Sequence, residues 1–131
     1  MSKIEKFSLK KRWKSFSYAF DGIKTLLKEE HNARIHLVAA FGVIVASIYL
    51  NISLIEWCLV VLCVVMIISA EAVNSAVENL TDLASPEYHP LARKAKDLAA
   101  AAVLIIAFGV AIIGGIIFLP KLYELLINVF L

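Results

Sequence analysis

The chain has 131 residues, of which 61% are hydrophobic and 18% are charged, and its mean hydropathy is +0.83. Soluble domains contain about 45–50% apolar residues, so this composition excludes an ordinary soluble globular protein. The formal net charge at pH 7 is only +2, but nine of the thirteen Lys and Arg residues lie in the first 34 positions. A basic end beside apolar segments is typical of the cytoplasmic side of a membrane protein, and we expect no nucleic acid partner.

Two kinds of site are excluded by the residues themselves. The phosphate-binding glycine motifs G-x-x-x-x-G-K-[ST] and G-x-G-x-x-G do not occur, so any phosphate chemistry must use another structure. Cys58 and Cys63 are five positions apart and do not form the C-x-x-C pair of redox and metal sites. We also expect no signal peptide, because Met1 is followed by a long polar stretch.

The segment 7–29 is predicted to form an amphipathic helix at the membrane surface. Large apolar residues recur every three or four positions, while lysines occupy other faces. These apolar residues are Leu9, Trp13, Phe16, Phe20, Ile23 and Leu27. The basic face would meet anionic headgroups, and the aromatic face would lie at the acyl boundary. A helix packed against its own bundle is an alternative that is compatible with the first interpretation.

Three stretches lack Asp, Glu, Lys and Arg, at 35–55, 57–70 and 98–119. The first and third are long enough to cross a bilayer, which takes about 20 residues. The second is shorter, but its apolar pattern continues, so a helix can span the membrane and then project into water. We predict an all-α membrane protein in a single domain, with membrane spans at 33–51, 53–83 and 90–119.

The distribution of basic residues predicts the orientation of these spans. The N-terminal segment is strongly basic and the second connection holds Arg93, Lys94 and Lys96, whereas the turn at 51–53 holds no Lys or Arg. By the positive-inside rule, we expect the N-terminus and the second connection in the cytoplasm. The first turn and the C-terminal end are expected on the other side, with Pro120 near the end of the third span.

The most informative stretch is E-A-V-N-S-A-V-E-N-L-T-D at 71–82, where four polar residues share one helix face. They are Glu71, Asn74, Glu78 and Asp82. At about 100° per residue, they lie within roughly 80° of one another. An ionisable group inside a membrane costs about 2.5 kcal/mol or more, so Glu71, which ends a long uncharged run, is a candidate functional residue. The plainer alternative is that these residues form a water-exposed helix face. Such a face would not need Asn74 on the same stripe or Glu71 at the edge of the membrane.

Two further polar clusters are expected at the same membrane surface, at 29–36 and at 87–97. Carboxylates suit Mg²⁺, which usually takes one or two of them together with substrate phosphates, and Lys or Arg suits the remaining phosphate charge. Convergence of the clusters therefore predicts phosphoryl transfer at a membrane surface. The histidines taken singly are weak signals for a metal, because zinc spacings such as H-E-x-x-H are absent.

Three motifs are informative together: E-A-V-N-S-A-V-E-N-L-T-D at 71–82, E-Y-H at 87–89 and A-K-D-L-A-A-A-A-V-L at 95–104. In these motifs the chain resembles the small prokaryotic integral-membrane diacylglycerol kinases, a family that includes undecaprenol kinases. The resemblance implies Mg²⁺-dependent transfer of phosphate from ATP to the primary hydroxyl of a membrane lipid alcohol. It also implies a homotrimer of three-span subunits in the bacterial inner (cytoplasmic) membrane, with composite active sites at the cytoplasmic surface.

The resemblance implies a role for each site residue by its position in the motifs. Glu71 is the expected general base on the lipid hydroxyl, and Glu30 and Glu78 are expected to hold Mg²⁺. The residues expected to contact ATP, together with those two carboxylates, are Lys11, Tyr18, Asn74, Glu87, Tyr88, His89, Lys96 and Asp97.

Some positions bear on the choice of lipid and on the phosphate contact. Lys11 stands where the best-studied members have Arg, which alters the geometry of that contact. His36 resembles the undecaprenol-kinase branch, whereas the diacylglycerol branch has an acid there. I-E-W at 55–57 and P-K at 120–121 favour the same branch, so undecaprenol is the preferred lipid and diacylglycerol the alternative.

Two other functions are compatible with the residues alone. A small oligomeric transporter or channel subunit could use Glu71 as an intramembrane coupling carboxylate. Such a protein would move ions or substrate across vesicles without consuming ATP. A non-catalytic assembly or regulatory subunit would tolerate replacement of the polar stripe.

Overall fold

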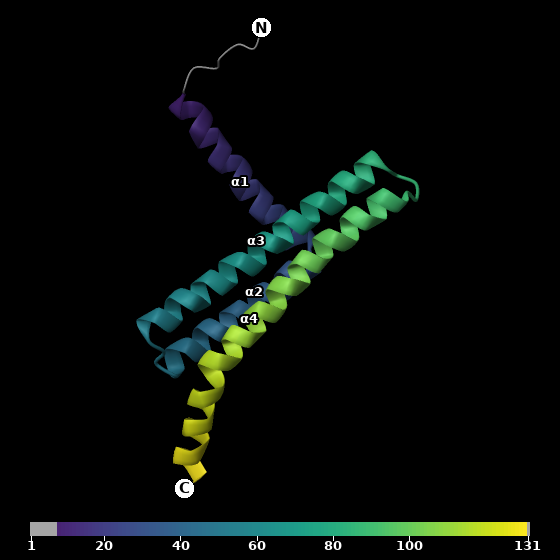
Figure 1. The fold of residues 1–131 in the computed structure, drawn as a ribbon. Coiled ribbons are helices and arrows are strands. Elements are labelled where there is room, and N and C mark those ends of the chain that lie inside the picture. The colour runs from purple at the N-terminus through teal and green to yellow at the C-terminus, as the bar shows by residue number, and fades with distance from the viewer. Residues whose placement is uncertain (1–7, 131) are drawn as a thin grey trace.

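The computed structural model describes residues 8–130, which form four helices and their connections. The helices are α1 (Leu9–Glu29), α2 (His31–Tyr49), α3 (Leu54–Ala84) and α4 (Pro90–Phe130). The last three are long and apolar enough to cross a membrane. No strand occurs among the described residues, so the predicted all-α fold, with one amphipathic helix and three apolar helices, is confirmed (Figure 1).

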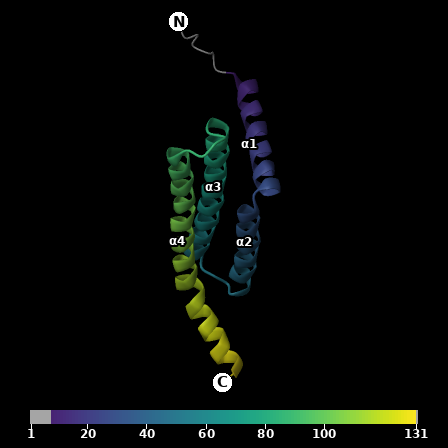
Figure 2. The same ribbon diagram turned by 90° about the vertical axis from the view of Figure 1, so that its right-hand side faces the viewer.

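Most of the large apolar residues of α1 lie on a face that the other described helices leave uncovered. Trp13 and Phe20 are 77% and 69% exposed, whereas Leu26, near the end of the helix, is buried. Figure 2 shows α1 standing apart from the other helices along most of its length. Its aromatic face is therefore available to a lipid interface, as an amphipathic surface helix requires.

A single residue separates α1 from α2. Glu30 has extended backbone angles, with φ −97° and ψ 114°. Its N–H still donates to the carbonyl of Leu26, and its own carbonyl accepts from the N–H of Arg34. Both helix ends are hydrogen-bonded across this break, so the change in direction is confined to Glu30.

The turn between α2 and α3 is tight and well capped. Asn51 has a φ of 48°, in the left-handed region that asparagine tolerates better than most residues. Ser53 and Glu56 form a capping box in which each side chain accepts a hydrogen bond from the other residue's backbone N–H. The ammonium of Lys121 lies 3.3 Å from Glu56, which links α4 to the start of α3.

α3 is the central helix, and both α2 and α4 pack against it. Its buried residues are Val60, Cys63, Ile67 and Glu71, which are three or four positions apart and share one face. The first three are apolar, so Glu71 ends an apolar seam with a carboxylate. Most other large apolar side chains of the spans are exposed in the single chain, which suits helices surrounded by lipid.

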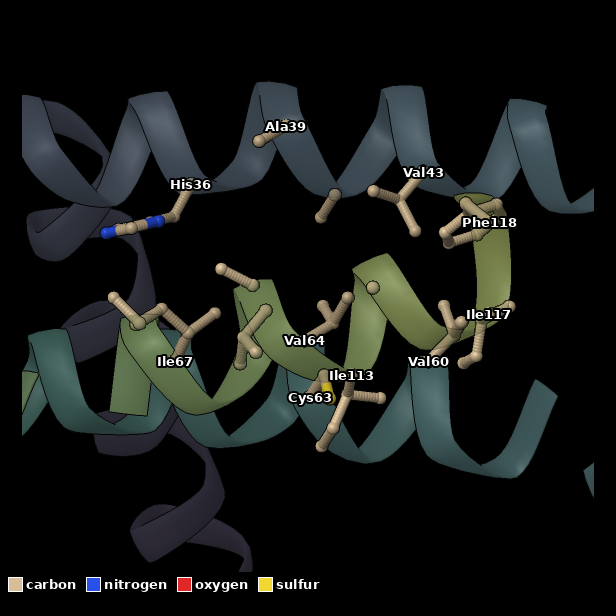
Figure 3. Close-up of a pocket in the computed structure, with 15 residues that line it drawn as sticks. His36, Ala39, Val43, Val60, Cys63, Val64, Ile67, Ile113, Ile117 and Phe118 are labelled. Atoms are coloured by element: carbon tan, nitrogen blue, oxygen red, sulfur yellow. The ribbon is translucent and has the colours of Figure 1, made fainter. Parts of the chain in front are cut away.

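An apolar cavity of about 210 Å³, which we call the apolar groove, lies between α2, α3 and α4. Alanine and glycine side chains leave this space open: Ala39, Ala40, Ala107, Ala111 and Gly114. Figure 3 shows His36 near one end of the groove and Phe118 near the other. Apart from His36 and the thiol of Cys63, the lining side chains are hydrocarbon or glycine. The groove therefore has one polar end.

α4 continues beyond the expected end of the third span. Pro120 lies inside the helix, which runs on to Phe130. A proline in a helix interior removes one backbone hydrogen bond and bends the helix, and Figures 1 and 2 show the last part of α4 turned away from the bundle. Pro120 thus marks a bend and not the end of the helix.

Candidate active site

Glu71 is a buried carboxylate, only 3% exposed, at the polar end of the apolar seam on α3. Nε2 of His36, on α2, lies 3.2 Å from Oε1 of Glu71. That oxygen nevertheless accepts no aligned hydrogen bond from any residue that the structure describes. Buried polar atoms without a partner are rare and costly. Glu71 thus keeps an oxygen that can accept a proton in a dry position.

Asn74 and Glu78 form a pair one turn further along the same stripe. Nδ2 of Asn74 donates a hydrogen bond of 3.1 Å to Oε1 of Glu78. Oδ1 of Asn74 is buried and has no partner among the described residues. A carboxylate has several acceptor sites, so the Glu78 carboxylate can bind a cation while it accepts the hydrogen bond from Asn74.

Ser75, on α3, binds Glu30, the single residue between α1 and α2. Its hydroxyl donates a hydrogen bond of 2.7 Å to Oε1 of Glu30, across 45 positions of sequence. The carboxylate of Glu30 is thereby placed beside the helix that carries Glu71 and Glu78. Glu30 is therefore hydrogen-bonded to a residue of α3 that lies three positions before Glu78, so the two carboxylates come from different segments to the same part of this helix.

Lys96 is brought onto the outer end of the α3 stripe. Its ammonium forms an ion pair with the carboxylate of Asp82, which fixes the start of α4 against the end of α3. Asp97, the next residue, accepts two hydrogen bonds from Nε of Arg93, at 3.0 and 3.2 Å. Both charges that were predicted to contact a nucleotide are thus held by neighbours within the chain.

The remaining predicted contacts to ATP lie at exposed ends of the molecule. Tyr18 is 61% exposed, with the Lys14 ammonium 5.8 Å from its ring centre, and Tyr88 is 80% exposed. Nδ1 of His89 accepts a hydrogen bond from the N–H of Leu91. Glu87 and Lys11 are exposed as well. Among the described residues, no hydrogen bond or ion pair joins Tyr18, Tyr88 or His89 to the α3 stripe.

Three contacts of the site were not predicted from the sequence. His36 was treated as a weak signal, yet it lies against Glu71. Ser75 has no assigned role by chemistry alone, yet it holds Glu30. Asp82 was placed on the stripe without a partner, and it binds Lys96. The position of Ser75 within the 71–82 motif could have indicated that its hydroxyl has a role. His36 lies in another helix, and nothing in the sequence around it indicates a contact with Glu71.

The donor set fits a hard cation only in part. Among residues 8–130, no three His, Cys, Asp or Glu side chains gather closely enough to hold a metal ion by themselves. Mg²⁺ usually takes one or two carboxylates and completes its shell with water and substrate phosphates. Glu30 and Glu78 supply two carboxylates of that kind, so the residues fit an ion that arrives with a phosphate substrate.

Comparison with known proteins identifies the family of the chain. Residues 17–118 match the family described as prokaryotic diacylglycerol kinase. An undecaprenol kinase of Bacillus subtilis (strain 168) is 40% identical over 121 residues, which cover 92% of this chain and 98% of that protein. A diacylglycerol kinase of Synechocystis is 39% identical over 116 residues, covering 86% of this chain and 65% of its own length. A diacylglycerol kinase of Escherichia coli (strain K12) is 34% identical over 106 residues, covering 81% and 86%.

The chain has three helices that are apolar enough to cross a membrane, and these kinases match it over most of its length. It is therefore a membrane lipid kinase. The chain belongs to the prokaryotic diacylglycerol kinase family. The predicted lipid-kinase function is thereby confirmed at the level of the family, ahead of the transporter and assembly-subunit alternatives.

Proposed function

We propose that the protein transfers the γ-phosphoryl group of ATP to the primary hydroxyl of a membrane lipid alcohol, with Glu71 as the general base. The observation that carries this proposal is the burial of Glu71 beside His36, a residue that also lines the apolar groove. A lipid alcohol has the same two parts, a hydrocarbon chain and a terminal hydroxyl. The hydroxyl can reach Glu71 while the chain stays in apolar surroundings.

The reaction moves one proton and replaces one phosphorus–oxygen bond with another. The Glu71 carboxylate takes the hydroxyl proton as the lipid oxygen attacks the γ-phosphorus. A bond forms between that oxygen and phosphorus, the bond from phosphorus to the β–γ bridging oxygen breaks, and ADP departs with the negative charge. Positioning and charge stabilisation dominate phosphoryl transfer, and a general base adds about 10²–10⁴-fold in rate.

Glu30 and Glu78 are assigned to hold Mg²⁺, which when bound offsets the negative charge of the phosphates. Ser75 and Asn74 support this assignment, because their hydrogen bonds hold each carboxylate in place. The two glutamates come from different segments of the chain, so neither fixes an octahedral ion alone.

The nucleotide is assigned to Asn74, Lys96 and Asp97. Lys96 and Asp97 lie in the second turn of α4, and Lys96 is bonded to the outer end of the stripe, where an ammonium group would attract phosphates. The residues further from the stripe that complete this assignment are Lys11, Tyr18, Glu87, Tyr88 and His89.

The active sites are proposed to be shared within a homotrimer. The exposure of Tyr18 and Tyr88 in the single chain supports this arrangement, since a neighbouring subunit could bring such residues to Glu71. The excess of basic residues in the first 34 positions supports a cytoplasmic N-terminus and active site, in the bacterial inner membrane. The four alanines at 99–102 would permit close helix contact at that surface.

Undecaprenol is the proposed lipid, and diacylglycerol is the alternative. His36, at the polar end of the groove, supports this choice because it matches the undecaprenol-kinase branch. The Bacillus subtilis relative, named as an undecaprenol kinase, aligns with nearly the whole chain.

Transfer of labelled phosphate from ATP to each lipid in mixed micelles tests the proposal. Purified protein should label undecaprenol faster than diacylglycerol, only with Mg²⁺ present, while the Glu71→Gln variant should label neither. Labelling of both lipids by that variant would exclude Glu71 as the base. Faster labelling of diacylglycerol would reverse the choice of lipid and leave the reaction intact.

A further inference from the structure

The last part of α4, residues 121–130, has a polar and an apolar face. We call it the C-terminal segment. At about 100° per residue, Lys121, Glu124 and Asn128 lie within roughly 60° of one another. Four large apolar residues occupy about 140° on the opposite side, also by the geometry of the helix. They are Leu122, Tyr123, Leu126 and Ile127.

The position of this segment follows from an ion pair. Lys121 lies 3.3 Å from Glu56, in the first turn of α3, so the segment begins where the bundle ends. From Asp97 to Lys121 the helix rises about 36 Å, slightly more than the roughly 30 Å hydrocarbon core of a bilayer. By this length the residues after Lys121 extend past the core. Figures 1 and 2 show the end of α4 at the opposite end of the molecule from α1.

The apolar face of this segment is uncovered in the single chain. Tyr123 is 67% exposed and Leu126 is 56% exposed. Full exposure to water would be costly for four adjacent large apolar side chains. The hydrocarbon core is equally unsuitable, because Glu124 is exposed and charged groups there are expensive. The boundary between headgroups and acyl chains satisfies both faces.

We propose that the C-terminal segment lies on the membrane surface opposite to α1, with its apolar face inserted into the acyl boundary of that leaflet. The bend at Pro120 turns the segment away from the direction of the span, which is the first part of the change that a surface position requires. Tyr123 suits this depth, since tyrosine is enriched at membrane interfaces. The chain would then carry an interfacial helix on each side of the bilayer and be held at both ends.

Spin labels attached to single cysteines test this in the full chain reconstituted into phosphatidylglycerol and phosphatidylcholine vesicles. Cys58 and Cys63 are first replaced by Ala, and labels are then placed at Tyr123, Leu126, Glu124 or Asn128, one per sample. Collision with oxygen reports lipid contact, and collision with a water-soluble nickel chelate reports water contact. We expect labels at Tyr123 and Leu126 to collide at least about threefold more with oxygen than with nickel, and labels at Glu124 and Asn128 to show the reverse.

Each other pattern overturns the proposal and identifies a different arrangement. High nickel collision at all four positions would mean that the segment projects into water. High oxygen collision at all four would mean that it continues through hydrocarbon. Low collision with both reagents at Tyr123 and Leu126 would mean that another copy of the chain covers this face. A label at Ile105, an exposed residue within the span, provides the reference value for hydrocarbon.

Discussion

Nε2 of His36 lies 3.2 Å from Oε1 of Glu71, so the imidazole on α2 faces the buried carboxylate on α3. The His36 side chain is 28% exposed, whereas the Glu71 side chain is 4% exposed. His36 also lines the apolar groove. His36 therefore contacts both the groove and the buried carboxylate, so the orientation of its ring bears on access from the groove to Glu71.

His36→Leu should lower kcat about tenfold to a hundredfold, because it removes the imidazole that lies 3.2 Å from Glu71 and can align with it during turnover, when catalytic hydrogen bonds tighten. A hydrogen bond to a charged group is worth about 1.5–3 kcal/mol. His36→Gln retains an N–H donor and should recover most of the loss. Steady-state kinetics with lipid and ATP varied separately would show whether kcat changes while KM for ATP stays constant. Equal losses in both variants, with unchanged thermal unfolding, would show that the donor has no role in turnover.

Glu71→Gln should abolish turnover and leave folding and ATP binding largely intact. The amide keeps the shape of the side chain but cannot take the hydroxyl proton, and loss of a general base typically costs about 10²–10⁴ in rate. The assay is phosphate transfer, with circular dichroism and nucleotide binding measured on the same sample. Glu124→Gln, an exposed glutamate at the other end of the molecule, is the matched control and should retain normal activity. A near-normal kcat in Glu71→Gln would remove the base assignment.

Glu30→Ala and Glu78→Ala should each raise the Mg²⁺ concentration needed for half-maximal activity, because each removes one carboxylate from the proposed ion. Excess Mg²⁺ should partly restore the less impaired variant. Glu29→Ala is the control, since Glu29 is the exposed neighbour of Glu30 and should titrate as the unmodified protein does. Unchanged Mg²⁺ titrations with normal activity in both variants would place the metal elsewhere.

Ser75→Ala should resemble a mild form of Glu30→Ala. The serine hydroxyl donates the 2.7 Å hydrogen bond that holds the Glu30 carboxylate beside α3. Its loss should weaken the apparent Mg²⁺ affinity about threefold to tenfold, in line with the roughly 0.5–1.5 kcal/mol of an ordinary hydrogen bond. In the double variant Ser75→Ala/Glu30→Ala, the effect of the serine should disappear. Additive losses would mean that Ser75 acts independently of Glu30.

Mixing Glu71→Gln chains with Tyr18→Ala chains should restore part of the activity if a neighbouring subunit brings Tyr18 to Glu71, since Tyr18 has no hydrogen bond to the α3 stripe within its own described chain. The two defects can then fall in different sites of one trimer and leave another site intact. Subunits are dissociated, mixed and reassembled in detergent, and cross-linking confirms that mixed oligomers form. Inactivity of such verified mixtures would indicate that each subunit carries a whole site.

The helices could be predicted from the sequence because hydropathy and spacing are local properties. The aromatic residues of α1 and the uncharged runs of the spans directly predict four helices. The bend at Pro120 could not be separated from a helix end, since proline is compatible with both. The contacts of His36 with Glu71 and of Ser75 with Glu30 depend on how α2 is rotated and shifted against α3. The position of α2 against α3 is set by packing along the seam of Val60, Cys63 and Ile67. It cannot be predicted from the sequence pattern of either helix alone.

Glu30 combines two properties that are usually found in different residues. Its backbone is the single extended link between α1 and α2, and its carboxylate is tied to α3. Any change in the angle between α1 and α2 must therefore turn about the residue whose carboxylate is hydrogen-bonded to Ser75. The direction of α1 and the position of this carboxylate on α3 are thus coupled through one glutamate.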